Sequence, residues 1–132
     1  MGCRNNHTTE CPVCRWIKAK TEVARLGTVA AFKDGYPVTE GHLLIVPLRH
    51  TPDWLSMTVK EIRDSEVLIR NLVDTFRQKE SSVTGFNIGT NIGRSAGQTV
   101  FHAHIHLIPR RDGDTNVPRG GVRGVIPGKR SY

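Results

Sequence analysis

Apolar residues recur along this chain at two spacings, which predict helices and strands in different places. From Val59 to about Glu80 they recur at the three- and four-residue steps of an amphipathic helix. Thr58 and Glu61 have the spacing of a capping box, in which each side chain pairs with a backbone N–H of the first turn. A shorter helix is predicted over Val13 to Lys20, because Pro12 suits a first helical turn.

Four stretches rich in β-branched or alternating apolar residues are predicted as strands. They are Thr28–Phe32, His42–Pro47, Phe86–Ile92 and Val100–Ile108. We expect Pro47 and Pro109 to end the second and the fourth. Strands on both sides of one long helix, without regular strand–helix alternation, predict an α+β fold. The sheet is expected to be mainly antiparallel, with about five strands.

The length of 132 residues suits one domain with polar extensions. Residues 1–10 are polar and expected to be flexible, residues 11–109 carry the predicted elements, and residues 110–132 form a basic tail containing Gly and Pro. Apolar runs are too short to cross a bilayer, and the N-terminus lacks the apolar stretch of a secretory signal. We therefore expect a cytoplasmic protein without a membrane partner.

The formal charge of +7 is concentrated in the tail, where six basic residues against two acidic ones leave +4. A positive field suits nucleotides, polyphosphates or nucleic acid. One hypothesis is therefore a zinc-stabilised nucleic-acid-binding module. Aromatic residues make up only 6% of the chain, which is few for the stacking surfaces of single-strand binders, so nucleic acid is the less favoured partner.

Three of the six histidines alternate with apolar residues in Phe101–Ile108. In a strand, His102, His104 and His106 would share one face at about 6.6 Å intervals, while the apolar residues face a core. Three histidines at every second position indicate one of two functions: metal binding, or nucleophilic and acid–base catalysis on an anionic substrate.

The cysteines bear on that choice, because Cys11 and Cys14 form a Cys-x-x-Cys that needs partners. With His50 and His102 they make a closed Cys2His2 set, the composition of a structural zinc site. His104 and His106 then remain for chemistry. A catalytic zinc held by all three alternating histidines is the alternative, but the outer two would lie roughly 13 Å apart along a strand.

The segment Gly97–Ile108 resembles the signature of the histidine-triad (HIT) family. That signature is His-φ-His-φ-His-φ-φ, with φ apolar, preceded by Gly-Gln. Gly41-His42 at the start of a strand ending in Pro47, and Asp34 eight residues earlier, extend the match over about Cys11 to Pro109. Many bacterial-type members also carry the Cys-x-x-Cys and a later histidine, and the tail is similar to that of one bacterial subset.

This resemblance implies a HIT-like fold and a homodimer that joins sheets across a two-fold axis. It implies an enzyme, a hydrolase or transferase that attacks the α-phosphate of adenosine nucleotides through a nucleotidyl-histidine intermediate. The implied catalytic residues are His104 as nucleophile, with His106 and His42. The implied nucleotide contacts are Asp34 to ribose, and Asn91, Gln98 and Thr99 to phosphate. The implied metal is structural Zn²⁺ on Cys11, Cys14, His50 and His102.

Among substrates, the resemblance favours diadenosine polyphosphates. Phosphoramidates, aminoacyl-adenylates and phosphorolysis in place of hydrolysis remain alternatives. We hypothesise that basic residues of the tail meet the extra negative charge of a polyphosphate leaving group. The residues meant are Arg110, Arg111, Arg119 and Arg123.

Overall fold

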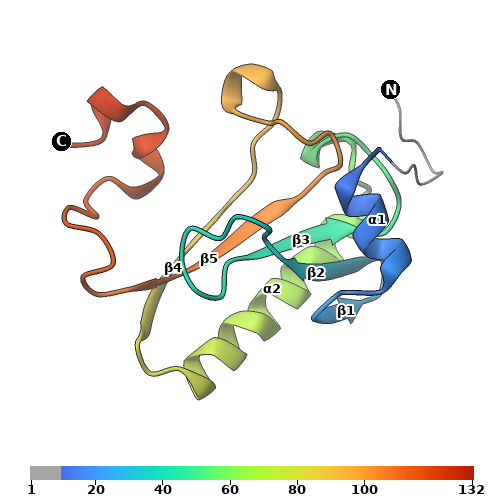
Figure 1. The fold of residues 1–132 in the computed structure, drawn as a ribbon, viewed down its shortest axis with the longest axis horizontal. Helices are drawn as coiled ribbons and strands as arrows, with labels where there is room; N and C mark the ends of the chain where they lie inside the picture. The colour runs from blue at the N-terminus through green and yellow to red at the C-terminus, as the bar shows by residue number, and fades with distance from the viewer. Residues whose placement is uncertain (1–9) are drawn as a thin grey trace.

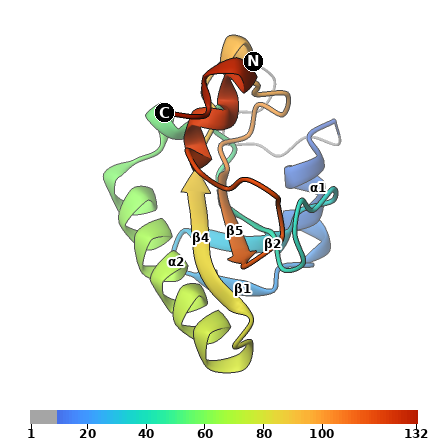
Figure 2. The same ribbon diagram turned by 90° about the vertical axis from the view of Figure 1, so that its left-hand side faces the viewer.

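The computed structural model describes residues 10–132 as one antiparallel sheet between two helices (Figures 1 and 2). The prediction that residues 1–10 are flexible concerns a segment outside the described residues, apart from Glu10. The strands are β1 (Ala24–Leu26), β2 (Val29–Lys33), β3 (Leu43–Pro47), β4 (Val83–Gly89) and β5 (Ile105–Arg111). Their order is β1-β2-β3-β5-β4, and every neighbouring pair is antiparallel. The predicted α+β class is confirmed.

The two helices cover opposite faces of the sheet (Figure 2). Helix α2 (Val59–Lys79) buries Leu68 against Ile45, Ile105 and Leu107. Helix α1 (Pro12–Ala19) packs on the other face, in a second cluster with residues of β2 and β3. The predicted Thr58–Glu61 capping box is present and starts α2 as expected.

Strand β1 was not predicted, because three residues including an arginine give too short a pattern. It joins β2 through a tight turn at Gly27, whose φ is +57°. A Cβ atom at Gly27 would collide with the Asp64 carboxylate, which accepts hydrogen bonds from Thr28 N and Thr28 Oγ1 at 2.8 and 2.7 Å. Glycine is therefore required where helix α2 approaches the β1–β2 turn.

The predicted limits of the last strand are wrong at both ends. The β3–β5 ladder stops at the pair Ile45–Ile105, so residues 102–104 lie outside the sheet, with a bend at His102. Pro47, at the end of β3, has no N–H with which to continue the ladder. At the other end β5 continues through Pro109, which pairs with Phe86 of β4. A proline is tolerated there, because β5 has no β3 partner beyond Leu107.

Strand β4 was placed three residues too late in the sequence. It begins at Val83 and ends at Gly89, so Asn91 lies in the loop after it. The 3-10 turn at Arg94–Ala96 then leads toward the histidines. Beyond β5 the tail contains two more 3-10 turns, Gly121–Val125 and Pro127–Lys129, and lies on the β4 side of the sheet, away from α1 (Figure 1). None of the described helices is both long enough and apolar enough to cross a bilayer.

Candidate active site and metal centre

Two clusters contain four histidines of the site. One is buried near α1 and contains His50 and His102, and the other contains His42 and His106, which line a cleft.

The predicted alternation of burial is present from Ala103 to Leu107, although only His106 of the three histidines lies within β5. Phe101, which was predicted to face a core, is 46% exposed, because it precedes β5 and lies outside the sheet. Ile105 and Leu107 face the α2 core. His106 is paired with Leu44, whose side chain belongs to the α1 cluster on the other face. Sequence periodicity therefore predicted the faces of residues 105–107 correctly, but it placed the start of the strand too early.

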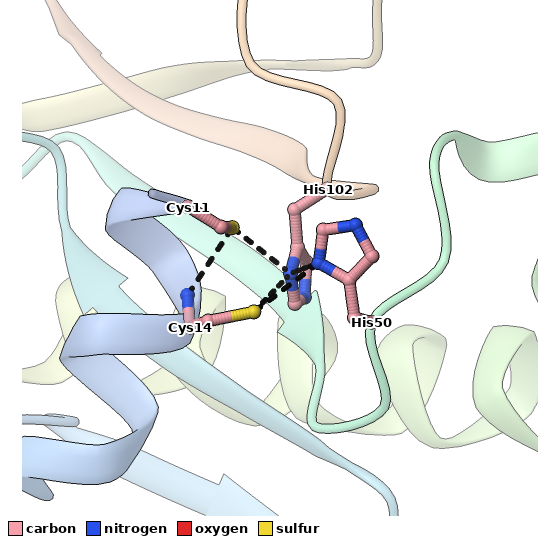
Figure 3. Close-up of side chains that lie close together, drawn as sticks. All are labelled: Cys11, Cys14, His50 and His102. Atoms are coloured by element: carbon pink, nitrogen blue, oxygen red, sulfur yellow. Dashed lines mark hydrogen bonds between the residues drawn. The ribbon is translucent and has the colours of Figure 1, made fainter. Parts of the chain in front are cut away.

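The first cluster brings together the four predicted metal ligands, as Figure 3 shows. Cys11 caps the start of α1, and its sulfur accepts a hydrogen bond from Cys14 N at 3.3 Å. His50 lies just past β3, and His102 lies just before β5. All four residues are at least 93% buried, and their ligand atoms lie within 4.8 Å of one another.

The sulfur–nitrogen distances in this cluster match those around one tetrahedral ion. The Nδ1 atoms of His50 and His102, 2.9 Å apart, lie somewhat closer than the ~3.3 Å between two nitrogen ligands of zinc. Cys14 Sγ lies 3.2 Å from His50 Nδ1 and 3.6 Å from His102 Nδ1, and Cys11 Sγ lies 3.5 Å from His102 Nδ1. Sulfur and nitrogen ligands of a tetrahedral zinc are separated by about 3.5 Å, given the usual Zn–S and Zn–N bond lengths. The cluster thus has the composition, burial and spacing to bind a metal.

A backbone carbonyl fixes the proton of His102. Its Nε2 lies 2.9 Å from Pro47 O, and a carbonyl only accepts, so this nitrogen carries the proton. The Nδ1 atom of the neutral ring is then a bare lone pair directed at the two sulfurs and His50. This is the tautomer that a metal ligand requires.

The His102 carbonyl fixes the proton of the next histidine in the same way. His104 Nδ1 lies 2.8 Å from His102 O, so Nδ1 donates and Nε2 holds the lone pair. The backbone around His104 is also held: Ala103 N donates to Thr51 O at 2.7 Å, and Thr90 Oγ1 donates to His104 O at 2.6 Å. These bonds replace the ladder that residues 102–104 lack.

His42 connects the β2–β3 loop to His106. Val38 N donates to His42 Nδ1 at 3.1 Å, so the ring proton is on Nε2. His42 Nε2 lies 2.9 Å from His106 Nδ1 and 3.3 Å from Asp34 Oδ2. With Nδ1 of His106 accepting, its Nε2 carries the proton. The trio Asp34, His42 and His106 is close enough to hold a metal, but a protonated Nε2 on His42 favours a hydrogen-bond network.

Burial keeps both rings of this pair neutral. It is the main cause that lowers the pKa of His42, against a smaller raising effect of the Asp34 carboxylate. Burial likewise lowers the pKa of His106, helped by the nearby rings of His104 and His42. Protonation of either ring would also place a proton on an Nδ1 atom that already accepts a hydrogen bond. On His42 that proton would face Val38 N–H, and on His106 it would face His42 Nε2–H.

The predicted nucleotide contacts are only partly brought together. Asn91 lines a cleft of about 540 Å³ together with His42 and His106. Thr99 is exposed, and Gln98 is buried with its amide engaged by the backbone. Gln98 Oε1 accepts from Gly93 N at 2.9 Å, and its Nε2 donates to Pro52 O at 2.8 Å and to Val100 O at 3.1 Å. In this structure Gln98 therefore holds the loop before the histidines.

Asp34 lies at the end of β2, beside the His42 ring. Its Oδ1 accepts from Tyr36 N at 2.7 Å and its Oδ2 faces His42. Sequence reasoning did not single out Val38, Thr51 or Thr90 in this region. Two of them act through backbone atoms, which carry no side-chain signal, and Thr90 is an ordinary threonine in the sequence.

The basic side chains of the tail are largely engaged within the protein. Arg110 pairs with Asp114 at 2.7 Å, and this hydrogen bond holds the pKa of the Asp114 carboxyl well below its usual range. Arg111 pairs with Glu80 at 3.0 Å. The guanidiniums of Arg119 and Arg123 lie over the Tyr132 ring.

Known proteins are similar to this chain in sequence or in fold. A HIT-like protein of Mycobacterium tuberculosis is 36% identical over 107 residues, 79% of this chain and 74% of that protein. The bis(5'-nucleosyl)-tetraphosphatase [asymmetrical] of Schizosaccharomyces pombe is 38% identical over 85 residues, 64% of this chain and 46% of that one. A crystal structure of a Zn-bound histidine triad family protein from Mycobacterium smegmatis superposes with a TM-score of 0.72 at 29% identity, covering 80% and 78% of the two chains.

The model of the HIT domain family matches residues 18–113, most of the chain. The matched range contains His42, His50 and the three alternating histidines, together with the sheet and helix α2 that hold them. The chain therefore belongs to the HIT family.

Proposed function

We propose that the protein hydrolyses diadenosine polyphosphates, or closely similar adenosine nucleotides, through a covalent nucleotidyl-His104 intermediate. The observation that carries this proposal is the His104 ring, whose Nδ1 donates to His102 O at 2.8 Å and leaves the Nε2 lone pair available. A neutral imidazole of this tautomer is nucleophilic near neutral pH. The yeast relative named as a tetraphosphatase supports the substrate class.

In the first step, the lone pair of His104 Nε2 forms a bond to the α-phosphorus, and the bond from phosphorus to the bridging oxygen breaks. The leaving group departs as a nucleoside polyphosphate anion that keeps both electrons of the broken bond. His104 is then a cation with a proton on Nδ1 and phosphorus on Nε2. The His102 carbonyl, already accepting from Nδ1, stabilises the positive charge as it develops.

In the second step, a water oxygen bonds to phosphorus and the N–P bond breaks. Its electron pair returns to Nε2, AMP is released, and a water proton passes to solvent. His106 Nε2–H, fixed by His42, donates a hydrogen bond to phosphate oxygens in both steps. We also propose that Asp34 accepts ribose hydroxyls and that Asn91 and Thr99 contact phosphate. The amide of Gln98 is engaged by Gly93 N, Pro52 O and Val100 O, so we propose that Gln98 supports this loop and does not itself bind phosphate.

We propose that the Cys11–Cys14–His50–His102 cluster holds a structural Zn²⁺. The donor set is closed, with two thiols and two Nδ1 atoms, and the similar M. smegmatis protein is zinc-bound. Such an ion would tie α1 to the loop after β3 and to the segment before β5. Keeping both thiols reduced is easiest in the cytosol, which we propose as the compartment.

We further propose a homodimer formed through the edge strand β4. The sheet ends at β4, and an apolar groove of about 710 Å³ runs between this strand and α2. Ile69, Val73, Phe86 and Ile88 line the groove, and Ile88 is 48% exposed. A second copy could extend the sheet and cover these side chains.

The dimer is tested by sedimentation equilibrium at micromolar concentrations, which should give the mass of two chains. A monomer found under these conditions would refute this assembly.

The covalent step is tested by incubating the protein with diadenosine tetraphosphate, quenching in alkali and examining peptides by mass spectrometry. We expect one adenylyl group on His104 of the wild type, and none on a His104→Ala variant whose turnover falls by at least about a thousandfold. Thr75→Ala, on the exposed part of α2, is the control and should keep both activity and adduct. An adduct on another residue would overturn the assignment.

The metal proposal predicts that Cys14→Ser lacks bound zinc and loses about 3 kcal/mol or more of unfolding free energy. The physical reason is that a hydroxyl is a poor zinc ligand, so three buried donors would remain without their ion. Zinc content by elemental analysis and urea denaturation measure the two effects. Cys3→Ser should retain zinc and stability. Stoichiometric zinc in Cys14→Ser would refute the ligand set.

The neutral His42–His106 pair predicts a pH dependence of stability. Folding lowers the pKa of both rings, so the unfolded chain binds more protons below the ordinary histidine pKa of about 6.5. The contribution of the two neutral rings to the free energy of unfolding is complete above that pH. It is lost as the pH falls through the lower pKa values of the folded protein. Urea unfolding of the wild type should therefore weaken more steeply below about pH 6.5 than that of His106→Asn. Parallel curves for the two proteins would count against the neutral pair.

A further inference from the structure

The segment after β5, beyond the range matched to the HIT family, is fastened beside the cleft at its first turn. Arg110 Nε and Nη2 donate to the two oxygens of Asp114 at 2.8 and 2.7 Å, and Arg110 Nη1 donates to Asn87 Oδ1 of β4 at 2.7 Å. Arg111 N also donates to Asp114 Oδ2 at 3.0 Å. A bidentate pair of this kind is geometrically specific, so it sets the direction in which the tail leaves the sheet.

The end of the tail folds back on itself. Gly120, with φ of +92°, lies against the Arg130 carbonyl so closely that no Cβ atom would fit. Arg123 Nη2 donates to Lys129 O at 3.0 Å, and the Arg119 guanidinium lies 4.6 Å from the centre of the Tyr132 ring. These contacts engage the basic groups within the tail and give residues 119–132 a defined shape.

The tail presents apolar side chains to the cleft. Val122 and Val125 line it together with Ile108 of β5, in the same cavity of about 540 Å³ that His42 and His106 also line. The two valines are 67% and 71% exposed. A cleft of this size, with apolar walls and a few polar groups, is typical of a small-molecule site. The part of a ligand that meets Val122 and Val125 should therefore present an apolar surface, as the face of a nucleoside base does.

Strand order indicates which part of the substrate that is. His106 lies on β5, Asp34 follows β2 on one side of it, and the tail is attached to β4 on the other. If the ribose of the reacting nucleotide meets Asp34, the group on the far side of the α-phosphorus extends toward the tail. Attacking and leaving groups are roughly in line in phosphoryl transfer, which also separates the two halves of the substrate.

We propose that Val122 and Val125 bind the nucleoside of the leaving group, so that the tail selects dinucleoside polyphosphates over mononucleotides. This inference rests on the proposed function, because it assigns one end of the cleft to the reacting nucleotide. The proposal changes the role expected for the tail. Its valines would contact the base of the leaving group, whereas the sequence suggested that its arginines bind the negative charge of a polyphosphate.

The test compares diadenosine tetraphosphate with ATP, whose leaving group is pyrophosphate without a base. In the full-length Val122→Ser/Val125→Ser variant, kcat/KM for diadenosine tetraphosphate should fall about tenfold, while kcat/KM for ATP should change less than about twofold. Val117→Ser is the matched control, since Val117 is an exposed valine of the same tail outside the set of cleft-lining residues. Val125→Ile, which keeps the apolar surface, should retain the preference.

Equal losses on both substrates, or no loss on either, would overturn the proposal. Limited proteolysis of the tail in each variant shows whether the valine changes have merely unfolded it: a variant cleaved faster than Val117→Ser is replaced by the single Val122→Ser change. A wild type that releases no AMP from either compound would instead refute the proposed function. The two failures are therefore distinguishable.

Discussion

Backbone groups around residues 102–106 decide which nitrogen of each imidazole carries the proton, and both sites of the molecule depend on this constraint. The Pro47 carbonyl sets His102, the His102 carbonyl sets His104, and Val38 N–H sets the pair formed by His42 and His106. Each partner can only donate or only accept, so each ring has one favoured tautomer. These contacts suit the three histidines, within five residues, to the proposed roles of metal ligand, nucleophile and hydrogen-bond donor.

The break in the sheet makes this arrangement possible. If β5 had continued to Val100, the carbonyl of His102 would have been directed into a ladder with β3 or β4. Instead Pro47 ends that ladder, and Thr51 and Thr90 hold the free segment through Ala103 N and His104 O. The His102 carbonyl is thereby available to the His104 ring. His102 thus belongs to both sites, because its ring lies in the Cys2His2 cluster and its carbonyl accepts from His104 Nδ1. If the cluster binds the proposed metal, loss of that metal would also disturb His104.

The sequence was informative where side-chain type and spacing carry the signal. The amphipathic helix, its capping box, the alternation of histidines and the Cys2His2 set all follow from residues that repeat at fixed intervals, and the four metal-ligand candidates do converge. The two ends of β5, at Ile105 and Arg111, could not be predicted from the sequence. They depend on the pairing of strands, which places Pro47 of β3 beside the start of β5 and leaves Pro109 without a partner in β3. The contacts from Val38 and Thr51 use backbone atoms, and the cleft wall at Val122 and Val125 depends on the path of a tail without periodicity.

The imidazole tautomers can be observed directly by long-range ¹H–¹⁵N correlation NMR of the uniformly ¹⁵N-labelled protein at neutral pH. Our account predicts that His104 carries its proton on Nδ1, and that His42 and His106 carry theirs on Nε2. A spectrum showing His104 protonated on Nε2, or as a cation in the resting protein, would contradict the account, because the Nε2 lone pair on which the proposed attack depends would then be absent.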